Sequence, residues 1–493
     1  MNVLLIYPEC PETFWSFKRA LRFASKRAGS PPLGLLTVAA MLPESWNKRL
    51  VDLHVRRLTE KDLRWADIAF VSGMVVQQHT ARVAIARCKE AGLRVVAGGP
   101  LFTLGHEYFP EVDHFVLNEA ESTLGPFLED LARGEAKRIY TSSEFPAIEE
   151  TPVPLWKLAD FRRYGWMSVQ YSRGCPHRCD FCNVTSLFGH RPRTKTSAQI
   201  IAELDALYAG GWRGSVFFVD DNFIGKKRAL KEDLLPALIA WQKGKSGIPF
   251  FTEVSIDLAD DTELMNLMHE AGFHMVFIGI ETPDEAGLTE CNKRQNVGRD
   301  LVADVKSIQR AGLQVQGGFI VGFDSDTPSI FQRQIDFIQK SGVVMAMVGI
   351  LQAVPGTELY RRLQREGRLA EQPSTGDNVD GTTNILPRMG MEHLSEGYRR
   401  LLKQLYSPKQ YYRRVRTFLR EFKTPRIQAR VQWSDLVALV RSSVRLGIVG
   451  RERFQYWRLL VWTFFRRTDL FGYVVAMAIC GHHFRKTCAH HVK

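Results

Sequence analysis

Three of the chain's eight cysteines lie within one stretch, YSRGCPHRCDFC, at residues 171–182. Cys175, Cys179 and Cys182 have the spacing C-x3-C-x2-C. A closed structural zinc site needs four ligands, and no fourth Cys or His stands at a suitable spacing. Three thiolates suit a 4Fe-4S cluster that leaves one iron open to another molecule. Buried thiols or a zinc knuckle are the alternatives.

The residues before this stretch predict a parallel sheet. Residues 1–139 alternate short apolar segments such as NVLLIY with helical stretches, and this pattern is typical of a doubly wound α/β fold. Ligands of such sheets bind at the carboxyl ends of the strands. No GxGxxG is present, so an ordinary dinucleotide site is not favoured. Small or turn-forming residues stand at two strand ends: Ser72, Gly73, Gly98, Gly99 and Pro100.

The rest of the chain predicts three further parts. Residues 140–160 combine prolines with acidic residues and are expected to be a linker. Residues 161–360 contain six strand-helix units, which predict a whole or partial β/α barrel of the TIM type with its site at the carboxyl ends of the strands. Strand signals fade afterwards, so residues 361–493 are expected to form a basic helical domain.

The cysteine motif CPHRCDFC follows the first predicted barrel strand and resembles the CxxxCxΦC signature of the radical S-adenosylmethionine superfamily. The resemblance implies that Cys175, Cys179 and Cys182 hold a 4Fe-4S cluster. It also implies that S-adenosylmethionine binds the open iron and is cleaved to methionine and a 5′-deoxyadenosyl radical. No protein nucleophile or general base is expected, so the cluster ligands are the whole catalytic set.

Other strand ends carry residues similar to the superfamily's S-adenosylmethionine-binding positions. Phe181 matches the aromatic residue that packs on adenine. Asp221 and Asn222, in FVDDNF, stand where the superfamily has its GGE-like motif for the methionine amino group, although this segment is acidic and lacks the glycines. Ser255 and Glu281 match positions used for the methionine carboxylate and the ribose.

One further strand is similar to the GxIxGxxE strand under the adenine. It reads GFIVGF and contains Gly318 and Gly322. Asp324 or Asp326 must replace the usual glutamate.

Several of these residues also have simpler interpretations. Asp220 and Asp221 could cap the following helix. Gly317 and Gly318 could allow close packing of strands, and Ser255 could be a surface hydroxyl.

The order of a sheet domain and a barrel resembles the cobalamin-binding subfamily, which includes hopanoid methylases and related C-methyltransferases. This implies a cobalamin whose nucleotide tail lies along Ser72-Gly73 and Gly98-Gly99-Pro100, near Asn118 and Glu119. The segment containing Asp52 and His54 is similar to the cobalt-ligating DxHxxG signature, but it follows the second strand and has Arg57 at the glycine position. We therefore expect His54 to be a strand-end histidine. A degenerate sheet that only packs on the barrel is the alternative.

The resemblance implies a cobalamin-dependent C-methyltransferase. The deoxyadenosyl radical would remove hydrogen from an unactivated carbon of a hydrophobic or polycyclic small molecule, and methylcobalamin would supply the methyl group. The expected electron donor is a reductant of the flavodoxin or ferredoxin type. Two alternatives stay open: radical oxidation, cyclisation or coupling without methyl transfer, and a non-catalytic cobalamin- or cluster-binding sensor.

Basic charge is concentrated near the C-terminus. Residues 401–493 hold 19 Lys and Arg against 4 Asp and Glu, whereas the remainder holds 47 against 49. The apolar segments FQYWRLLVWTFF and LFGYVVAMAIC are too short and too interrupted to span a bilayer, but they suit contact with an anionic membrane surface. A helical cap over the barrel with a solvated basic face is an equal alternative. No RNA-binding motif is present, so nucleic acid is not favoured.

The N-terminus, MNVLLIYPEC, lacks the basic segment and long apolar run of a secretory signal. The other cysteines are scattered, as is usual in a reducing compartment. We therefore expect a cytoplasmic protein, with peripheral contact at the inner face of the membrane through its C-terminal region.

Overall fold

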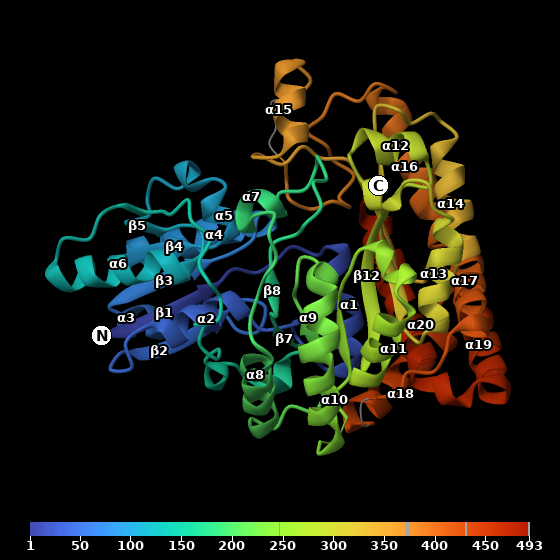
Figure 1. Cartoon of the computed structure of the whole chain (residues 1–493), viewed down its shortest axis with the longest axis horizontal. Coiled ribbons are helices and arrows are strands. Elements are labelled where there is room, and N and C mark those ends of the chain that lie inside the picture. Colours follow the sequence, from blue (N-terminus) through green and yellow to red (C-terminus); the bar gives the residue numbers. More distant parts are fainter. Residues whose placement is uncertain (246, 371–373, 429–430, 492–493) are drawn as a thin grey trace.

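The computed structural model describes the chain except for residues 246, 371–373, 429–430 and 492–493. Two six-stranded sheets stand side by side, and the helices of the C-terminal region lie beside the second sheet (Figure 1). The carboxyl edges of both sheets carry the residues that the sequence singles out.

The first sheet has the strand order β2-β1-β3-β4-β5-β6, and every neighbouring pair is parallel. Alternate residues of its central strand enter different cores: Val3 and Leu5 pack on one face, and Leu4 and Ile6 pack on the other. Both faces are therefore covered, as a doubly wound sheet requires. The strands are β1 (Asn2–Tyr7), β2 (Asn47–Asp52), β3 (Ile68–Ser72), β4 (Arg94–Gly98), β5 (His114–Val116) and β6 (Ile139–Tyr140), and the main helices are α2 (Leu33–Met41), α3 (Glu60–Trp65), α4 (Gln78–Glu90), α5 (Pro100–Thr103) and α6 (Ala120–Arg133).

The second sheet has the order β14-β13-β12-β11-β10-β7, again all parallel. Within the described residues β7 and β14 do not pair with each other, so the barrel is partial. The strands are β7 (Met167–Val169), β10 (Val216–Phe218), β11 (Phe250–Glu253), β12 (Phe273–Glu281), β13 (Gln314–Val321) and β14 (Ala346–Ile350). The helices are α8 (Ser197–Ala209), α10 (Leu235–Lys243), α11 (Thr262–Ala271), α13 (Leu301–Arg310) and α14 (Ile330–Ser341), with a π-helical turn at Leu230–Leu234 before α10.

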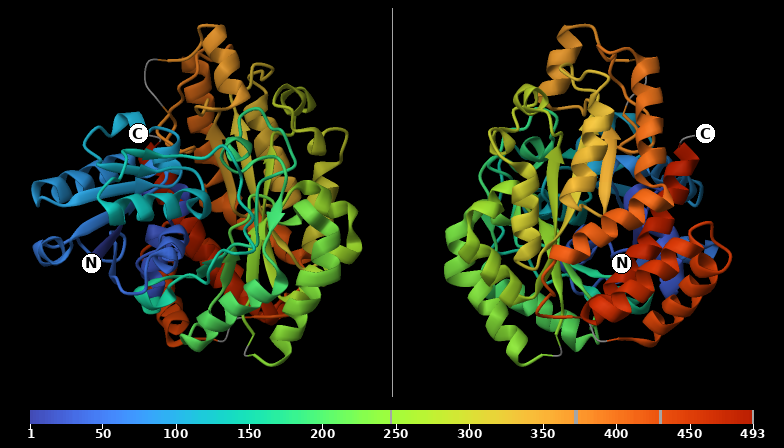
Figure 2. Two further views of the ribbon diagram at one scale, coloured as in Figure 1. Left: turned by 60° about the vertical axis from the view of Figure 1, so that its left-hand side comes forward. Right: turned by 90° about the vertical axis from the view of Figure 1, so that its right-hand side faces the viewer.

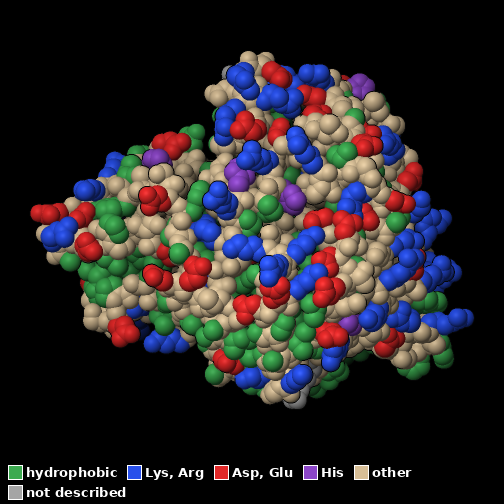
Figure 3. Space-filling model, viewed as in Figure 1, with side chains coloured by type: hydrophobic (Ala, Val, Ile, Leu, Met, Phe, Trp, Pro, Cys, Tyr) green, Lys and Arg blue, Asp and Glu red, His purple; other side chains and the backbone are tan. Residues whose placement is uncertain are grey.

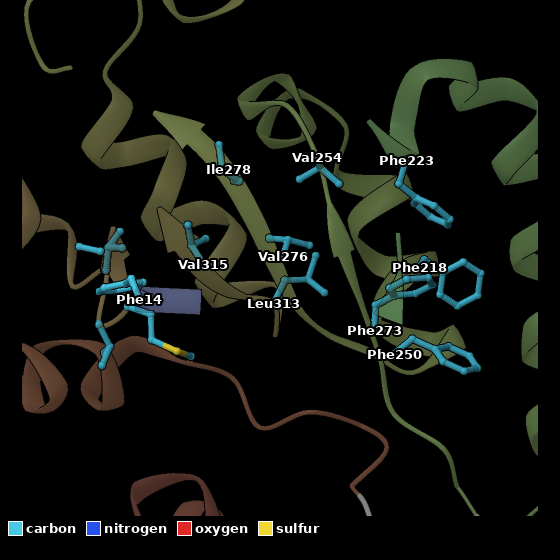
Figure 4. Packing of buried hydrophobic residues seen from close by; sticks show 14 of the residues in the cluster. Phe14, Phe218, Phe223, Phe250, Val254, Phe273, Val276, Ile278, Leu313 and Val315 are labelled. Carbon is cyan, nitrogen blue, oxygen red and sulfur yellow. The ribbon is translucent and has the colours of Figure 1, made fainter. Parts of the chain in front are cut away.

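The barrel strands present different residues to the helices and to the barrel interior. Phe218, Phe250 and Phe273 are fully buried in one aromatic group on the helix-covered side (Figure 4). The neighbouring residues Phe217 and Phe251 point the opposite way and stack with ring centroids 4.6 Å apart. They are only partly buried, so the interior of the barrel keeps an accessible aromatic surface.

The segment between the sheets is packed. The backbone N–H of Leu155 donates to the carbonyl of Leu36 at 3.0 Å, and Ile148 and Trp156 are buried. The first sheet ends at Tyr140, one residue inside the range expected to be a linker.

The C-terminal region is helical, as predicted. It comprises α15 (Glu358–Arg365), α16 (Met391–Leu405), α17 (Pro408–Glu421), α18 (Trp433–Gly447), α19 (Arg453–Arg466) and α20 (Phe471–His491). The end of α20 lies against the N-terminal part of the chain (Figure 2), where the ring of Phe484 stacks on Phe14 with centroids 4.0 Å apart. No helix among the described residues is long and apolar enough to cross a membrane.

The expectation that both apolar C-terminal segments are interfacial is wrong for LFGYVVAMAIC. That segment starts α20, and its Val474, Met477 and Ala478 are buried against neighbouring helices. Its apolar residues form core because α16, α17, α18 and α19 surround the helix.

Candidate active site

The cysteines lie on a loop, residues 174–192, that we call the cluster loop. Its base is closed by two short antiparallel strands, β8 (Ser172–Arg173) and β9 (Arg193–Thr194). Gly174 has φ +91°, and a Cβ there would lie 3.0 Å from three backbone carbonyl oxygens of the same loop. Only glycine fits this position, so the cluster loop has a fixed base.

The three cysteines are free and partly buried, and the cluster loop is tied to the barrel around them. The backbone N–H of Asp180 donates to the carbonyl of Cys291 at 3.1 Å. Burial raises the pKa of all three cluster-loop thiols, to about 12 for Cys182, and the neighbouring Lys293 acts in the opposite direction.

Cys175, Cys179 and Cys182 fit an iron-sulfur cluster better than a single ion. Within the described residues no group of three or more His, Cys, Asp or Glu converges closely enough to hold one metal ion. The thiolates of a 4Fe-4S cluster bind different irons, so their sulfurs need not converge on one point. The donor set of three thiols on one loop therefore suits the cluster, and a zinc knuckle has no support from the geometry.

Glu281 forms a buried ion pair that the sequence did not indicate. Its Oε1 lies 2.7 Å from Nζ of Lys293, and the side chains of Glu281 and Lys293 are only 7% and 13% exposed. Burial alone would lower the pKa of Lys293, but the charges of Glu281 and Cys179 outweigh it and raise that pKa. Glu281 also has φ +65°, an uncommon backbone conformation for a glutamate. Lys293 therefore places a permanent positive charge beside the cysteines.

Asn222 and Ser255 lie together at the ends of β10 and β11. The side-chain amide of Asn222 donates to the hydroxyl of Ser255 at 3.1 Å, and the backbone N–H of Ser255 donates to Oδ1 of Asn222 at 3.2 Å. Ser255 is thus partly buried and bonded, and the interpretation as a free surface hydroxyl is wrong.

Asp220 and Asp221 do not cap the following helix, so that interpretation is also wrong. Asp220 accepts the hydroxyl of Ser172 at 2.5 Å, and Asp221 accepts the backbone N–H of Gly174 at 2.9 Å. Burial raises the pKa of Asp220 to about 7 and that of Asp221 to about 6. Asp220 thus joins the end of β10 to β8 at the base of the cluster loop, and Asp221 joins it to the loop itself.

The two candidate aspartates after β13, Asp324 and Asp326, have different partners. Asp326 accepts the backbone N–H of Gly322 at 2.7 Å, whereas Asp324 is engaged by Arg368 at 2.6 Å. Asp326 is therefore the one that faces the strand end. Gly322 has φ +103°, which a side chain would strain.

Gly318 and Phe181 occupy neighbouring parts of the same edge. A Cβ on Gly318 would lie 2.9 Å from the ring of Phe277, so close packing explains this glycine as well. Phe181 packs, with Ile320, against a small buried cluster that contains Phe323.

Glu253 is a second residue that sequence reasoning missed. It is the last residue of β11. The preceding residue, Thr252, is buried on the helix-covered face of the sheet, so the side chain of Glu253 points to the opposite face. Burial raises the pKa of Glu253 to about 8, and the charges of Asp221 and Asp220 raise it further. A carboxyl group that is protonated near neutral pH thus stands on the same side of the sheet as Phe251. No sequence motif marks it.

The edge of the first sheet is built from small residues at close approach. A Cβ on Gly98 would lie 2.5 Å from the carbonyl oxygen of Val116, and one on Gly99, where φ is +88°, would collide with the hydroxyl of Ser72. The backbone N–H of Leu101 donates to the carbonyl of Gly73 at 3.0 Å, and Pro100 begins α5. The five predicted residues therefore lie together at an edge with few protruding side chains.

Asn118 and Glu119 are engaged elsewhere. The side chain of Asn118 accepts the hydroxyl of Thr141 at 2.6 Å. Glu119 is buried and pairs with Arg173 and Arg193, each at 2.6 Å. Glu119 thus joins the first sheet to the base of the cluster loop, and the expectation that it lies beside a cobalamin tail has no support from these contacts.

His54 is a strand-end histidine, as predicted. Its Nδ1 lies 2.8 Å from Oδ1 of Asp52, and its Nε2 lies 2.9 Å from the backbone nitrogen of Cys10. Both ring nitrogens are engaged within the protein, so His54 is not available as a metal ligand.

A cavity of about 620 Å³ lies where loops from the two sheets meet. Val76 and His79 come from the chain after β3, Pro11 follows β1, and Asp377 belongs to the loop after the barrel. The first sheet reverses its strand order between β1 and β3, and such switch points are the usual ligand positions of doubly wound sheets. Sequence reasoning did not find this cavity because its walls come from distant segments.

Comparisons with known proteins agree with this arrangement. Residues 169–338 match the Radical SAM superfamily, and residues 357–493 match a domain of unknown function, DUF4070. An uncharacterized methyltransferase of Synechocystis sp. is 39% identical over 98% of this chain and 91% of its own length. The hopanoid C-2 methylase of Rhodopseudomonas palustris is 32% identical over 98% of this chain and 92% of its own.

A solved structure shares the fold over most of the chain. The cobalamin-dependent S-adenosylmethionine radical enzyme OxsB with aqua-cobalamin bound superposes with a TM-score of 0.62 at 15% identity, covering 95% of this chain and 80% of that one. The predicted succession of a doubly wound sheet, a partial barrel and a helical region is thereby confirmed.

The site and the fold define a radical S-adenosylmethionine enzyme. The chain belongs to the methyltransferase family of this superfamily that its two full-length relatives represent. The predictions of an enzyme and of iron-sulfur and S-adenosylmethionine cofactors are confirmed at the level of the family.

Proposed function

We propose that this protein is a cobalamin-dependent radical C-methyltransferase whose substrate is a hydrophobic or polycyclic small molecule. The single observation that carries this proposal is the relationship to the hopanoid C-2 methylase over 98% of the chain. When bound, the cluster and S-adenosylmethionine supply a radical that removes hydrogen from a carbon, and methylcobalamin supplies the methyl group. The protein's own residues bind and orient these groups.

Cys175, Cys179 and Cys182 hold the cluster in this proposal. The Glu281–Lys293 pair places positive charge beside the anionic thiolates, which stabilises a negatively charged cluster in a buried setting. Asn222 and Ser255 offer paired hydrogen-bonding groups to the amino acid end of S-adenosylmethionine.

The remaining S-adenosylmethionine residues keep the roles that the resemblance implies, with two changes. Phe181 packs near the adenine, and Gly318 and Gly322 lie on the strand beneath it. Asp221 acts through the cluster loop because it accepts the N–H of Gly174, and Asp326, not Asp324, stands in for the usual glutamate.

Cobalamin occupies the region between the sheets. The cavity at the β1–β3 switch point supports this placement, as does the fold shared with a cobalamin-bound enzyme. Ser72, Gly73, Gly98, Gly99 and Pro100 offer an edge with few protruding side chains to its nucleotide tail. Because both nitrogens of His54 are engaged, no histidine of the β2 end binds cobalt from below.

The interior of the barrel supports an apolar substrate. Phe217 and Phe251 stack on each other, and the ring of Trp166 contacts Phe251 edge-on. Glu253 adds one carboxyl group, protonated at neutral pH, that can hydrogen-bond a polar substituent of such a substrate. A flavodoxin- or ferredoxin-type protein supplies the electron.

Mass spectrometry of lipids and pigments from cells with and without the gene tests this function. The proposal predicts a product that is heavier than its precursor by one CH2 and that is lost when Cys175, Cys179 and Cys182 are replaced by alanine. A product that differs by hydrogen or oxygen alone would instead establish the non-methylating radical enzyme. An unchanged metabolite profile would favour the non-catalytic sensor.

A further inference from the structure

Helices α18 and α19 expose apolar side chains that a folded domain ordinarily buries. On α18 these are Trp433, Leu436, Val440 and Val444, and Trp433 is 78% exposed. Their spacing of three or four residues places them in one stripe along the helix.

The next helix repeats the arrangement. Phe454, Trp457, Val461, Phe464 and Phe465 follow the same spacing on α19, and Phe454 and Phe465 are 75% and 77% exposed. Single exposed apolar residues are common on protein surfaces, but two adjacent helices with such stripes mark an interaction site.

The exposed stripes are not a sign of loose packing. The opposite face of α18 buries Ser442 and Leu446, and that of α19 buries Tyr456 and Leu459. The hydroxyls of Ser442 and Tyr456 lie 3.0 Å apart and join the helices. At the turn, the indole N–H of Trp457 donates to the carbonyl of Gly447 at 2.9 Å. Helices α18 and α19 with their turn, residues 433–466, therefore form a fixed hairpin.

The exposed charge around these stripes is mostly positive. The exposed arginines of the hairpin make no salt bridge among the described residues; they are Arg441, Arg445, Arg451, Arg453, Arg458 and Arg466. Lys and Arg gather along the corresponding edge of the molecule (Figure 3).

Acidic residues do not balance these arginines. Glu452 is buried and paired with His482 and Arg485, which leaves Asp435 as the hairpin's exposed carboxylate within the described residues. On neighbouring α17, burial together with the charges of Arg458 and Arg420 lowers the pKa of Arg416. Within the described part of the chain, the exposed positive charge of the hairpin therefore exceeds its exposed negative charge.

We infer that the hairpin of α18 and α19 docks on an anionic lipid surface. Tryptophan and phenylalanine side chains enter the boundary between headgroups and acyl chains, and arginines meet the anionic headgroups. A second copy of the chain is a poorer partner, because its hairpin would bring the same positive charge into contact. Docking is peripheral, since no described helix can span a bilayer.

The hairpin lies away from the candidate active site. Ile427, just before it, contacts Gly247 and Gly272, which precede β11 and β12 at the amino ends of those strands. The guanidinium of Arg441 donates to the carbonyl of Arg22 at 2.8 Å, on the same side of the molecule. Membrane docking therefore leaves the cluster loop free, and the inference does not depend on the proposed reaction.

Co-sedimentation of the full-length protein with vesicles tests the inference. We expect binding to vesicles that contain phosphatidylglycerol and much weaker binding to pure phosphatidylcholine. The triple variant Arg451→Glu, Arg458→Glu and Arg466→Glu should weaken binding by roughly a hundredfold or more, because each cation near the surface contributes ~1 kcal/mol. Arg467 is left intact because it donates to the carbonyls of Leu419 and Phe422.

A matched control carries the same change of charge on the first domain. Arg57, Arg64 and Arg94 are exposed there, and their replacement by Glu should leave lipid binding within about twofold of the wild type. A second variant, Phe454→Ser, Phe464→Ser and Phe465→Ser, should also release the protein while retaining its cluster and S-adenosylmethionine cleavage. Equal binding by control and hairpin variants would overturn the inference. So would a wild-type protein that ignores anionic vesicles and instead forms a dimer that the serine variant dissociates.

Discussion

The carboxyl edges of the two sheets differ in what they offer a ligand. The edge of the second sheet presents cysteines, carboxylates and a lysine: Asp221 accepts the backbone N–H of Gly174, and Lys293 pairs with Glu281. The edge of the first sheet presents backbone and small side chains, as at Gly98. In the proposed function, the first edge would therefore bind by shape and the second by specific chemical groups.

The two edges also differ in how they are held. At the second edge, ionisable groups are largely buried, and each affects the charge state of its neighbours. At the first edge, the constraint is steric, since a Cβ on Gly98 would meet a backbone oxygen. Substitutions at the two edges should accordingly fail in different ways.

Removing the thiols should abolish the cluster. A variant with Cys175→Ala, Cys179→Ala and Cys182→Ala should retain almost no iron after anaerobic reconstitution, whereas the wild type should hold about four irons and four sulfides per chain. Cys10→Ala is the control and should keep its iron. Iron and sulfide analysis measures the effect, and an iron-replete triple variant would disprove the assignment.

Breaking the Glu281–Lys293 ion pair should lower the free energy of unfolding more than any other single substitution proposed here. Lys293→Met leaves the Glu281 carboxylate buried without its partner, and such changes typically destabilise proteins by about 3–5 kcal/mol. The double variant Lys293→Met with Glu281→Gln should recover much of that loss, because no unpaired charge is left. Urea unfolding of the apoprotein measures both. A single variant as stable as the wild type would show that the pair is not buried in solution.

Glu253 should make stability depend on pH. Its pKa of about 8 in the folded chain exceeds its ordinary value, so the folded state keeps a proton that the unfolded state loses. Stability should therefore fall as pH rises between about 5 and 8.

Glu253→Gln should make the free energy of unfolding fall less steeply with pH. The difference in slope corresponds to one proton, at most about 1.4 kcal/mol per pH unit. Thermal unfolding across this pH range measures the slope. Glu129→Gln, an exposed change on α6, should follow the wild-type curve. Identical slopes for Glu253→Gln and the wild type would count against a protonated Glu253.

Adding a single methyl group at the carboxyl edge of the first sheet should destabilise the protein. Gly98→Ala brings a Cβ to 2.5 Å from the carbonyl oxygen of Val116 and should cost about 1–3 kcal/mol of unfolding free energy and weaken cobalamin binding. Gly34→Ala is the control: its Cβ would meet nothing within 4 Å inside α2, so it should stabilise the chain by about 0.5–1 kcal/mol. Chemical denaturation and cobalamin absorbance titrations measure these effects. Unchanged stability in Gly98→Ala would mean that the edge is not tightly packed.

The sequence predicted the parts of the site that have local patterns. The spacing of Cys175, Cys179 and Cys182 is visible within one loop, and the succession of strands and helices places Asn222 and Ser255 at neighbouring strand ends. Lys293 and Glu253 were missed because their significance comes from burial beside residues that are distant in the chain. The ion pairs of Glu119 were missed for the same reason: its partners Arg173 and Arg193 lie beyond the linker.

The C-terminal helices show why composition alone misleads. The apolar start of α20 became core, whereas the exposed stripe of α18 includes Trp433 and Val440 and its buried face includes Ala438 and Ser442. Sequence periodicity identifies two sides of a helix, but it does not say which side meets the rest of the protein. That depends on the position of α19 and α20.

We propose that the carboxyl edge of the second sheet supports radical formation and that the carboxyl edge of the first sheet supports methyl transfer. The most direct measurement supplies the anaerobically reconstituted protein with dithionite, S-adenosylmethionine and its substrate, with and without added cobalamin, and quantifies 5′-deoxyadenosine and S-adenosylhomocysteine. We predict deoxyadenosine under both conditions and S-adenosylhomocysteine with a methylated product only when cobalamin is present. Deoxyadenosine alongside a substrate altered without methylation, or S-adenosylhomocysteine that forms equally without cobalamin, would contradict the account.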